Sequence, residues 1–292
     1  MRRFLSLLIC IALVISLSSC SGGENKAISY SLSASPVTLD PQFATDVNAH
    51  LVINNSFEGL VRLSANGEII PGIAESWSVS PDGLTYIFNL KQGTEWYCPS
   101  SLKNEFGSEF YNKFSSEKVT ARDFVFAMQR AVSPETNSPS AHRLFVIENA
   151  VEVHSGNADV SALGVSAPQD YTLIIKLREP CTDMLERLTE SVFMPCNEEF
   201  FNTMNGRYGL THRHILCNGP FYVSMWDKEG SLSIRKNKYY SGEQEVLPSS
   251  VNFSFDYNAQ SIANKISTAT TSAGILPPDT ETPENAVVIK EN

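Results

Sequence analysis

The spacing of two histidines and a cysteine suggests metal chemistry. His212 and His214 stand two residues apart in "THRHILC", and Cys217 completes that stretch. On a β-strand, both imidazoles would lie on one face, and histidine and cysteine together are common zinc ligands. Because no carboxylate lies nearby, a chance pair of surface histidines is the favoured interpretation. The sequence therefore predicts no metal site and no cofactor.

Catalytic motifs are missing from the sequence. It contains no G-x-S-x-G elbow, no H-E-x-x-H helix, no G-x-G-x-x-G turn and no Walker loop. Adjacent carboxylates such as Glu198 and Glu199 diverge on regular structure, which favours a solvated face over paired acid–base chemistry. We therefore predict no catalytic residues and a protein that is not an enzyme. A hydrolase is kept as an alternative that turnover of a peptide library would support.

The cysteines of the chain body do not form a recognisable pattern. Their spacings match no zinc motif, and disulfide pairing in an exported protein cannot be read from spacing. Disulfides and buried or free thiols are therefore both open. The four residues are Cys98, Cys181, Cys196 and Cys217.

The first 20 residues predict export. Two arginines precede a short apolar run and a small-residue segment, "LSSC". The run is too short to span a bilayer, which takes about 20 apolar residues, so residues 1–19 are interpreted as a signal peptide. Since "LSSC" resembles the lipobox of bacterial lipoproteins, we expect Cys20 to carry the lipid anchor and residues 20–27 to form a tether. The expected location is the extracytoplasmic face of the bacterial cell membrane or the periplasm.

The charge balance excludes a nucleic-acid partner. The chain has 32 acidic and 22 basic residues, a net charge of −10 among 292 residues. Such a surface repels phosphates, whose binding needs clustered lysine and arginine. The length is enough for about two domains.

Several segments have the apolar alternation of half-buried strands. Residues 27–34 place Ile28, Tyr30, Leu32 and Ala34 on one face, and residues 84–91 repeat the pattern with Leu84, Tyr86, Phe88 and Leu90. Similar runs begin at residues 171 and 251.

A helix is expected after residue 120. Thr120 caps it, Asp123 lies in its first turn, and Pro134 ends it. Its apolar stripe would consist of Phe124, Ala127, Met128 and Ala131. Strands mixed with helices over this length predict an α/β protein with a mixed sheet.

The order of several longer motifs resembles that of the family 5 extracellular solute-binding proteins, the dipeptide and oligopeptide receptors of ABC importers. The similarity covers nearly the whole chain after the tether and is strongest toward the oligopeptide branch. The motifs are "TLDPQ" (38–42), "FEGLVRL" (57–63), "PGIAESW" (71–77), "VTARDFVFAMQRAVSPETNSP" (119–139), "LGVSAPQDYTLIIKLREP" (163–180) and "NGPFYVSMWDKEGSLSIRKNKYY" (218–240).

The resemblance implies a lobe of the type II periplasmic-binding-protein fold. Residues 28–56 and 196–292 would form the main subdomain of the first lobe, and residues 57–195 a small α+β subdomain. It also implies a monomeric receptor that binds an oligopeptide as an added strand and delivers it to ABC permease subunits. Relatives within the family bind nickel complexes, haem or oligosaccharides, so these ligands are kept as alternatives.

Two segments are implied as peptide contacts. Thr45, Asp46 and Val47 would offer a strand edge after the "LDP" motif, with an ordinary solvent loop as the alternative. Gly274, Ile275 and Leu276 would form a second contact region, although "STATT" at 267–271 replaces the Gly-Glu-Ile-Asp run usual in the family.

Two departures from the family pattern lead to further expectations. Residues 97–118 form an insertion in which Phe106, Phe110 and Phe114 recur every four residues, which predicts one short helix packed on the small subdomain or a partner surface. The sequence ends at Asn292, where the family would cross the hinge, so we expect the second lobe to be absent. A non-transporting lipoprotein that acts in interaction or sensing, or a degenerate gene product, is therefore a further alternative.

Overall fold

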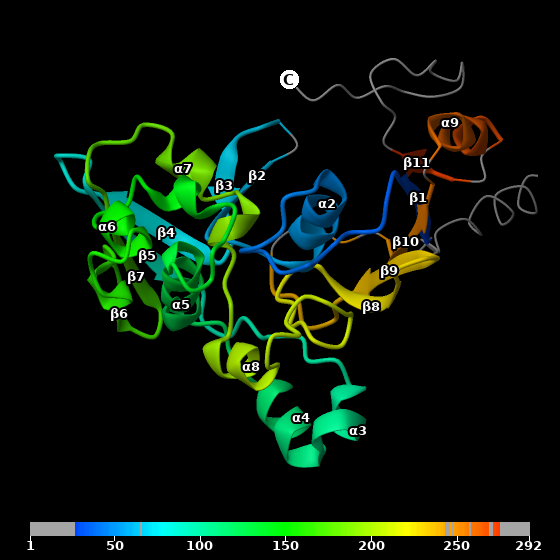
Figure 1. Cartoon of the computed structure of the whole chain (residues 1–292), viewed down its shortest axis with the longest axis horizontal. Coiled ribbons are helices and arrows are strands. Elements are labelled where there is room, and N and C mark those ends of the chain that lie inside the picture. Colours follow the sequence, from blue (N-terminus) through cyan, green and yellow to red (C-terminus); the bar gives the residue numbers. More distant parts are fainter. Residues whose placement is uncertain are drawn as a thin grey trace, which may run out of the picture.

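Two β-sheets with helices between and around them make up the described chain. The computed structural model describes residues 27–64, 66–242, 246, 248–256, 258–268 and 271–274. The two sheets lie on either side of helix α2 (Val47–Ser56), and a pair of short helices projects below them (Figure 1).

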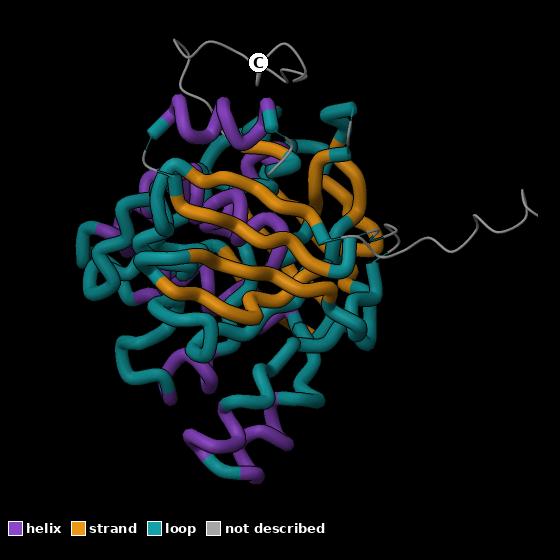
Figure 2. Tube along the Cα trace, turned by 90° about the vertical axis from the view of Figure 1, so that its right-hand side faces the viewer, coloured by secondary structure: helices purple, strands orange, loops and turns teal. Residues whose placement is uncertain are grey.

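The larger sheet has five strands in the order β11-β1-β10-β9-β8. Strand β1 runs parallel to both of its neighbours, whereas β9 is antiparallel to β10 and β8, so the sheet is mixed as predicted. One of its faces is open to the viewer in Figure 2. The strands are β1 (Ile28–Leu32), β8 (Phe221–Asp227), β9 (Ser231–Lys236), β10 (Ser250–Phe255) and β11 (Ala273–Gly274).

The smaller sheet has four antiparallel strands in the order β4-β5-β7-β6. They are β4 (Ala74–Val79), β5 (Thr85–Leu90), β6 (Val165–Gln169) and β7 (Thr172–Lys176). Tyr86, Phe88 and Leu90 of β5 are buried, which confirms the predicted inward face. A separate hairpin joins β2 (Val61–Leu63) to β3 (Ile69–Pro71). The subdomain boundaries at residues 57 and 195 stay a prediction.

Helix α5 (Ala121–Val132) confirms the helix expected after residue 120. It begins with a capping box in which the Thr120 N–H donates to Asp123 Oδ2 at 2.7 Å. The whole predicted apolar stripe is buried, and it packs against β6 and β7.

Hydrogen bonds join the "FEGL" motif to the "NGPF" motif, 160 positions further along the chain. The side chain of Asn218 accepts from the Glu58 N–H at 3.1 Å and donates to the Glu58 carbonyl at 2.9 Å. A Cβ at Gly219 would lie 2.7 Å from the backbone nitrogen of Phe57, so only glycine fits there. These residues therefore act as scaffold.

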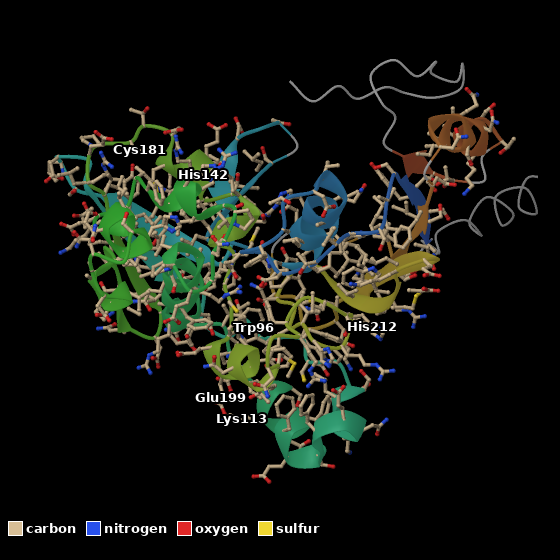
Figure 3. All side chains as sticks on the ribbon, in the orientation of Figure 1. Trp96, Lys113, His142, Cys181, Glu199 and His212 are labelled. Carbon is tan, nitrogen blue, oxygen red and sulfur yellow. The ribbon has the colours of Figure 1, made fainter. Side chains whose placement is uncertain are left out.

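The insertion differs from the expectation of one helix on the small subdomain. It forms α3 (Leu102–Phe106) and α4 (Ser108–Phe114), because Gly107 between them has φ of 90°. Phe110 packs between Phe106 and Phe114 at centroid distances of 4.6 and 4.7 Å, and Phe110 and Phe114 also contact Phe200. Phe200 belongs to α8 (Glu198–Thr203), which lies outside the predicted small subdomain. Lys113 and Glu199 form an ion pair across the same contact (Figure 3).

Short helices complete the described structure. In the described part of the chain, no helix is long and apolar enough to cross a membrane. The α-helices not yet given are α6 (Ala150–His154), α7 (Met184–Arg187) and α9 (Ala259–Ser267), and the 3-10 helices are η1 (Ala141–Leu144), η2 (Val160–Ala162) and η3 (Ser191–Phe193).

Candidate functional site

The first predicted ligand segment lies at the start of helix α2. Thr45 is exposed, and the side chain of Val47 has an exposed fraction of 54%. Asp46 has an extended backbone, with φ of −92° and ψ of 147°, but its carboxylate caps α2 by accepting from the Ala49 N–H at 2.7 Å. The expectation of a strand edge is therefore wrong at Val47, which is already helical. The ligand role of the segment stays a prediction.

The second predicted segment begins at the edge of the larger sheet. Gly274 ends β11, where it lies opposite Ser31 of β1. No strand among the described residues pairs with the outer side of β11, so β11 is an edge strand of the described sheet. Ile275 and Leu276 lie outside the described residues.

Both segments lie at the carboxyl end of β1. Asn48, in the first turn of α2, donates from Nδ2 to Ser33 Oγ at 3.3 Å, just beyond the end of β1. Gly274 lies beside Ser31, two residues earlier. The carboxyl ends of parallel strands are where open α/β sheets usually bind ligands. The structure thus brings the described members of the predicted site together at the carboxyl end of β1.

A buried ion pair fixes the loop that leads into this edge. Asp40 accepts two hydrogen bonds from the guanidinium of Arg130, at 2.7 and 2.6 Å, and both side chains are less than a tenth exposed. Because Arg130 belongs to α5, this pair ties the loop to the helix that covers the smaller sheet. Sequence reasoning missed the pair; an arginine within a helix otherwise rich in buried residues was the available signal.

Gln42 adds a second attachment. Its amide donates from Nε2 to the carbonyls of Val192 and Met194, at 3.2 and 2.8 Å, and its side chain is fully buried. The Ser138 hydroxyl donates to the Gln42 carbonyl. The loop is therefore held from several sides, and Thr45 and Val47 are presented on a fixed backbone.

Polar side chains flank α2 on the side of the smaller sheet. His50 on α2 hydrogen-bonds through Nδ1 to Ser191 Oγ at 2.9 Å, which joins α2 to η3. Arg143 in η1 pairs with Glu190 at 3.3 Å, immediately before η3. Sequence reasoning did not single out these residues, since no motif links segments so far apart in the chain.

A network anchors the carboxyl end of β10. Lys265 of α9 donates to both oxygens of Asp256, at 2.8 and 2.7 Å. Burial opposes ionisation of Asp256, but the hydrogen bonds from Lys265 and Ser31 and the charge of Lys265 outweigh it, so the pKa of Asp256 lies below its usual value. The ionised carboxylate thus fixes α9 on the way to β11.

One histidine of the predicted pair, His214, has a structural role. His212 and His214 lie in a turn and not on a strand, and His214 is buried, so the expectation of a surface pair is wrong for it. Nε2 of His214 lies 3.1 Å from Glu105 Oε1, and this hydrogen bond, with that of Arg207, holds the pKa of Glu105 below its usual value. The described residues contain no group of histidine, cysteine and carboxylate side chains suited to a metal ion.

All four cysteines of the body are free thiols in the structure. Burial raises the pKa of Cys98, Cys196 and Cys217 to about 12 in each case, so these thiols are protonated at neutral pH and unreactive. Cys181 is partly exposed and donates to Asp183 Oδ1 at 2.9 Å.

Comparison with known proteins finds similar sequences that are much longer. One relative is the oligopeptide-binding protein AmiA of Streptococcus pneumoniae, 29% identical over 82% of this chain and 36% of its own length. Another is the probable deoxycholate-binding periplasmic protein YgiS of Escherichia coli, 30% identical over 77% of this chain and 39% of its own. The chain thus spans less than half the length of these relatives.

The fold is shared with solved receptor structures. The substrate-binding domain of an oligopeptide ABC transporter from Bacillus anthracis superposes with a TM-score of 0.77 at 29% identity, over 85% of this chain and 45% of that one. The expected α/β solute-binding fold is thereby confirmed. Residues 68–286 match the family model described as bacterial extracellular solute-binding proteins, family 5 middle. The chain belongs to this family of extracellular solute-binding proteins.

Proposed function

We propose that this protein binds extended peptides outside the cytoplasm for an ABC importer, and that it is not an enzyme. The observation that carries the proposal is the edge built at the carboxyl end of β1. There, an edge strand, β11, and the exposed start of α2 lie on a rigid scaffold. Similarity to peptide-binding relatives supports the same ligand class.

Backbone groups would carry most of the recognition. An added strand takes its hydrogen bonds from main-chain groups, which accept any side chain and so suit a receptor for mixed peptides. Gly274 offers such groups on β11, and the Val47 N–H has no acceptor within the described part of the chain. The fixed loop around Asp40 reduces the conformational entropy that binding would otherwise cost.

A proline at position 47 tests the proposal. Val47 is the first residue of α2, where proline is tolerated, and the extended backbone of Asp46 suits a residue before proline. Val47→Pro therefore removes one N–H without breaking the helix. Losing one such hydrogen bond should weaken peptide binding roughly three- to tenfold. The matched control, Val47→Ala, keeps the N–H and shortens the exposed side chain.

Binding is measured by calorimetry with a mixed peptide library, and by amide hydrogen exchange where affinity is low. Thermal unfolding of both variants checks that α2 is intact. Equal peptide binding by Val47→Pro and the wild-type protein would remove Val47 from the site. Deoxycholate, the ligand in the name of YgiS, is titrated in parallel. Binding of deoxycholate without any peptide binding would overturn the proposed ligand class.

Anchoring at the membrane is a further part of the proposal. We infer that Cys20 carries the lipid and that the receptor meets its permease at the outer face of the membrane; residues 1–26 lie outside the described structure. The "LSSC" motif supports this inference. Metabolic labelling with palmitate should mark the wild-type protein and leave Cys20→Ser unlabelled. Processed protein without label in the wild type would contradict it.

A further inference from the structure

A basic cavity lies on the larger sheet, beside the insertion. It has a volume of about 440 Å³ and is lined by β8, β9, the start of the insertion and the turn that holds His212. His212 is labelled next to β8 in Figure 3. No lining residue is acidic, although the protein as a whole has a net charge of −10. The cavity is therefore a local departure from the charge of the surface.

Two arginines of this cavity differ from every other arginine that the structure describes. Arg213 and Arg235 both line it, and neither has a carboxylate within salt-bridge distance in the described part of the chain. The remaining described arginines all have one. They are Arg62, Arg122, Arg130, Arg143, Arg178, Arg187 and Arg207. The two described arginines without an ion pair among the described residues thus line the same cavity.

The position of Arg235 follows from the fold. Arg235 alternates with the buried Ile234 on β9, so it lies on the opposite face of the sheet, where it is exposed. It stands directly opposite Tyr222 of β8. Tyr222 stacks on Tyr97 with ring centroids 3.8 Å apart, which gives the cavity a rigid aromatic wall.

Neutral donors complete the site. The hydroxyls of Ser100 and Ser101 also line the cavity, and neither makes a side-chain hydrogen bond within the described residues. Burial, followed by the neighbouring charges of Arg213 and His214, lowers the pKa of His212, so its imidazole is mostly uncharged at neutral pH. Two guanidinium charges and two hydroxyls without a side-chain hydrogen bond among the described residues therefore line one space.

We propose that this cavity is an anion site that binds a phosphate group, through the guanidiniums of Arg213 and Arg235 and the hydroxyls of Ser100 and Ser101. A guanidinium matches two phosphate oxygens at once, and two guanidiniums carry enough positive charge to balance either a phosphate monoester or a phosphodiester. Two bidentate guanidiniums and two hydroxyls can donate about six hydrogen bonds, which exceeds the roughly four lone-pair sites of a carboxylate and suits the larger set of oxygens on a phosphate. The site is separate from the peptide edge and does not depend on the proposed function.

Inorganic phosphate is the first probe. Calorimetry with the purified chain should give saturable binding of one phosphate per protein. The double variant Arg213→Gln with Arg235→Gln should bind at least about tenfold more weakly, since each arginine contributes charge-assisted hydrogen bonds. The control, Arg122→Gln with Arg178→Gln, removes the same two charges from exposed positions away from the cavity and should stay within about twofold of the wild type.

A second arm separates two sources of the phosphate. Vesicles of phosphatidylglycerol and of phosphatidylcholine are compared for all three proteins, which share one N-terminus. Binding to phosphatidylglycerol that needs Arg213 and Arg235 assigns the site to a lipid headgroup. Phosphate binding without vesicle binding assigns it to a soluble phosphate ester. No saturable phosphate binding by the wild type, or an equal loss in the control, would overturn the proposal.

Discussion

Replacement of Arg130 by methionine should destabilise the protein far more than an ordinary arginine substitution. Methionine fills similar space but leaves the carboxylate of Asp40 and the amide oxygen of Gln42 without their partner. Asp40 accepts two hydrogen bonds from Arg130, and each bond to a charged group contributes about 1.5–3 kcal/mol. A buried pair that loses one member typically costs about 3–5 kcal/mol. We expect a loss of unfolding free energy in that range.

The assay is urea unfolding followed by tryptophan fluorescence, at one pH and one salt concentration. The control is Arg122→Met, a substitution in the same helix. The Arg122 side chain is 77% exposed and its pair with Asp170 spans 3.3 Å, so its loss should cost about 0–1 kcal/mol. Equal losses for the two variants would refute the reasoning that burial makes the Arg130 pair important.

A double-mutant cycle separates the pair from other effects of the substitution. Asp40→Asn removes the charge that Arg130 would leave unpaired. When both residues are replaced, no buried charge is left, so the double variant should lose clearly less than the sum of the single losses. A coupling energy below about 0.5 kcal/mol would mean that the two side chains act independently.

Two further predictions test the electrostatics and the packing of the scaffold. Burial raises the pKa of Asp123 to about 7, so the folded state keeps a proton that the unfolded state loses above about pH 4, and stability should fall by about 1.4 kcal/mol per pH unit toward pH 7. Asp123→Asn should remove this slope in urea unfolding between pH 5 and pH 7; an unchanged slope would assign it to other groups. Gly219→Ala should cost about 1–3 kcal/mol in thermal unfolding because its Cβ meets the backbone of Phe57. Gly230→Ala, whose Cβ meets only the flexible carboxylate of Asp227, should be close to neutral, and equal losses would contradict the packing argument.

Local patterns in the sequence predicted the elements that bury one face. Alternation indicated β1, β5, β7 and β10, and the cap with its apolar stripe indicated α5, since each depends only on neighbours along the chain. The insertion shows the limit of periodicity. Its phenylalanines predicted one helix, but the positive φ of Gly107 divides it into two.

The candidate site depends on contacts that periodicity cannot give. Asp40 and Arg130 are 90 positions apart, and the parallel pairing of β1 with β10 and β11 joins opposite ends of the chain. At Asp46, a local signal was present, because aspartate is a favoured N-cap and Val47 opens the helix. The expected strand edge at Val47 came from resemblance, and the structure has the first residue of a helix at that position.

The buried polar groups around Asp40 make sense when a ligand is recognised through its backbone. Such a ligand offers few distinctive groups, and each hydrogen bond to it contributes little to the free energy of binding. The entropy cost of ordering the receptor would offset that small contribution. We expect a loop already held by Arg130 and by the amide of Gln42 to need little ordering if it binds a peptide as proposed. We therefore expect Arg130→Met to weaken peptide binding as well as the fold, although Arg130 is buried behind the loop. Hydrogen exchange of the amides at residues 43–47 would then rise together with the loss of affinity.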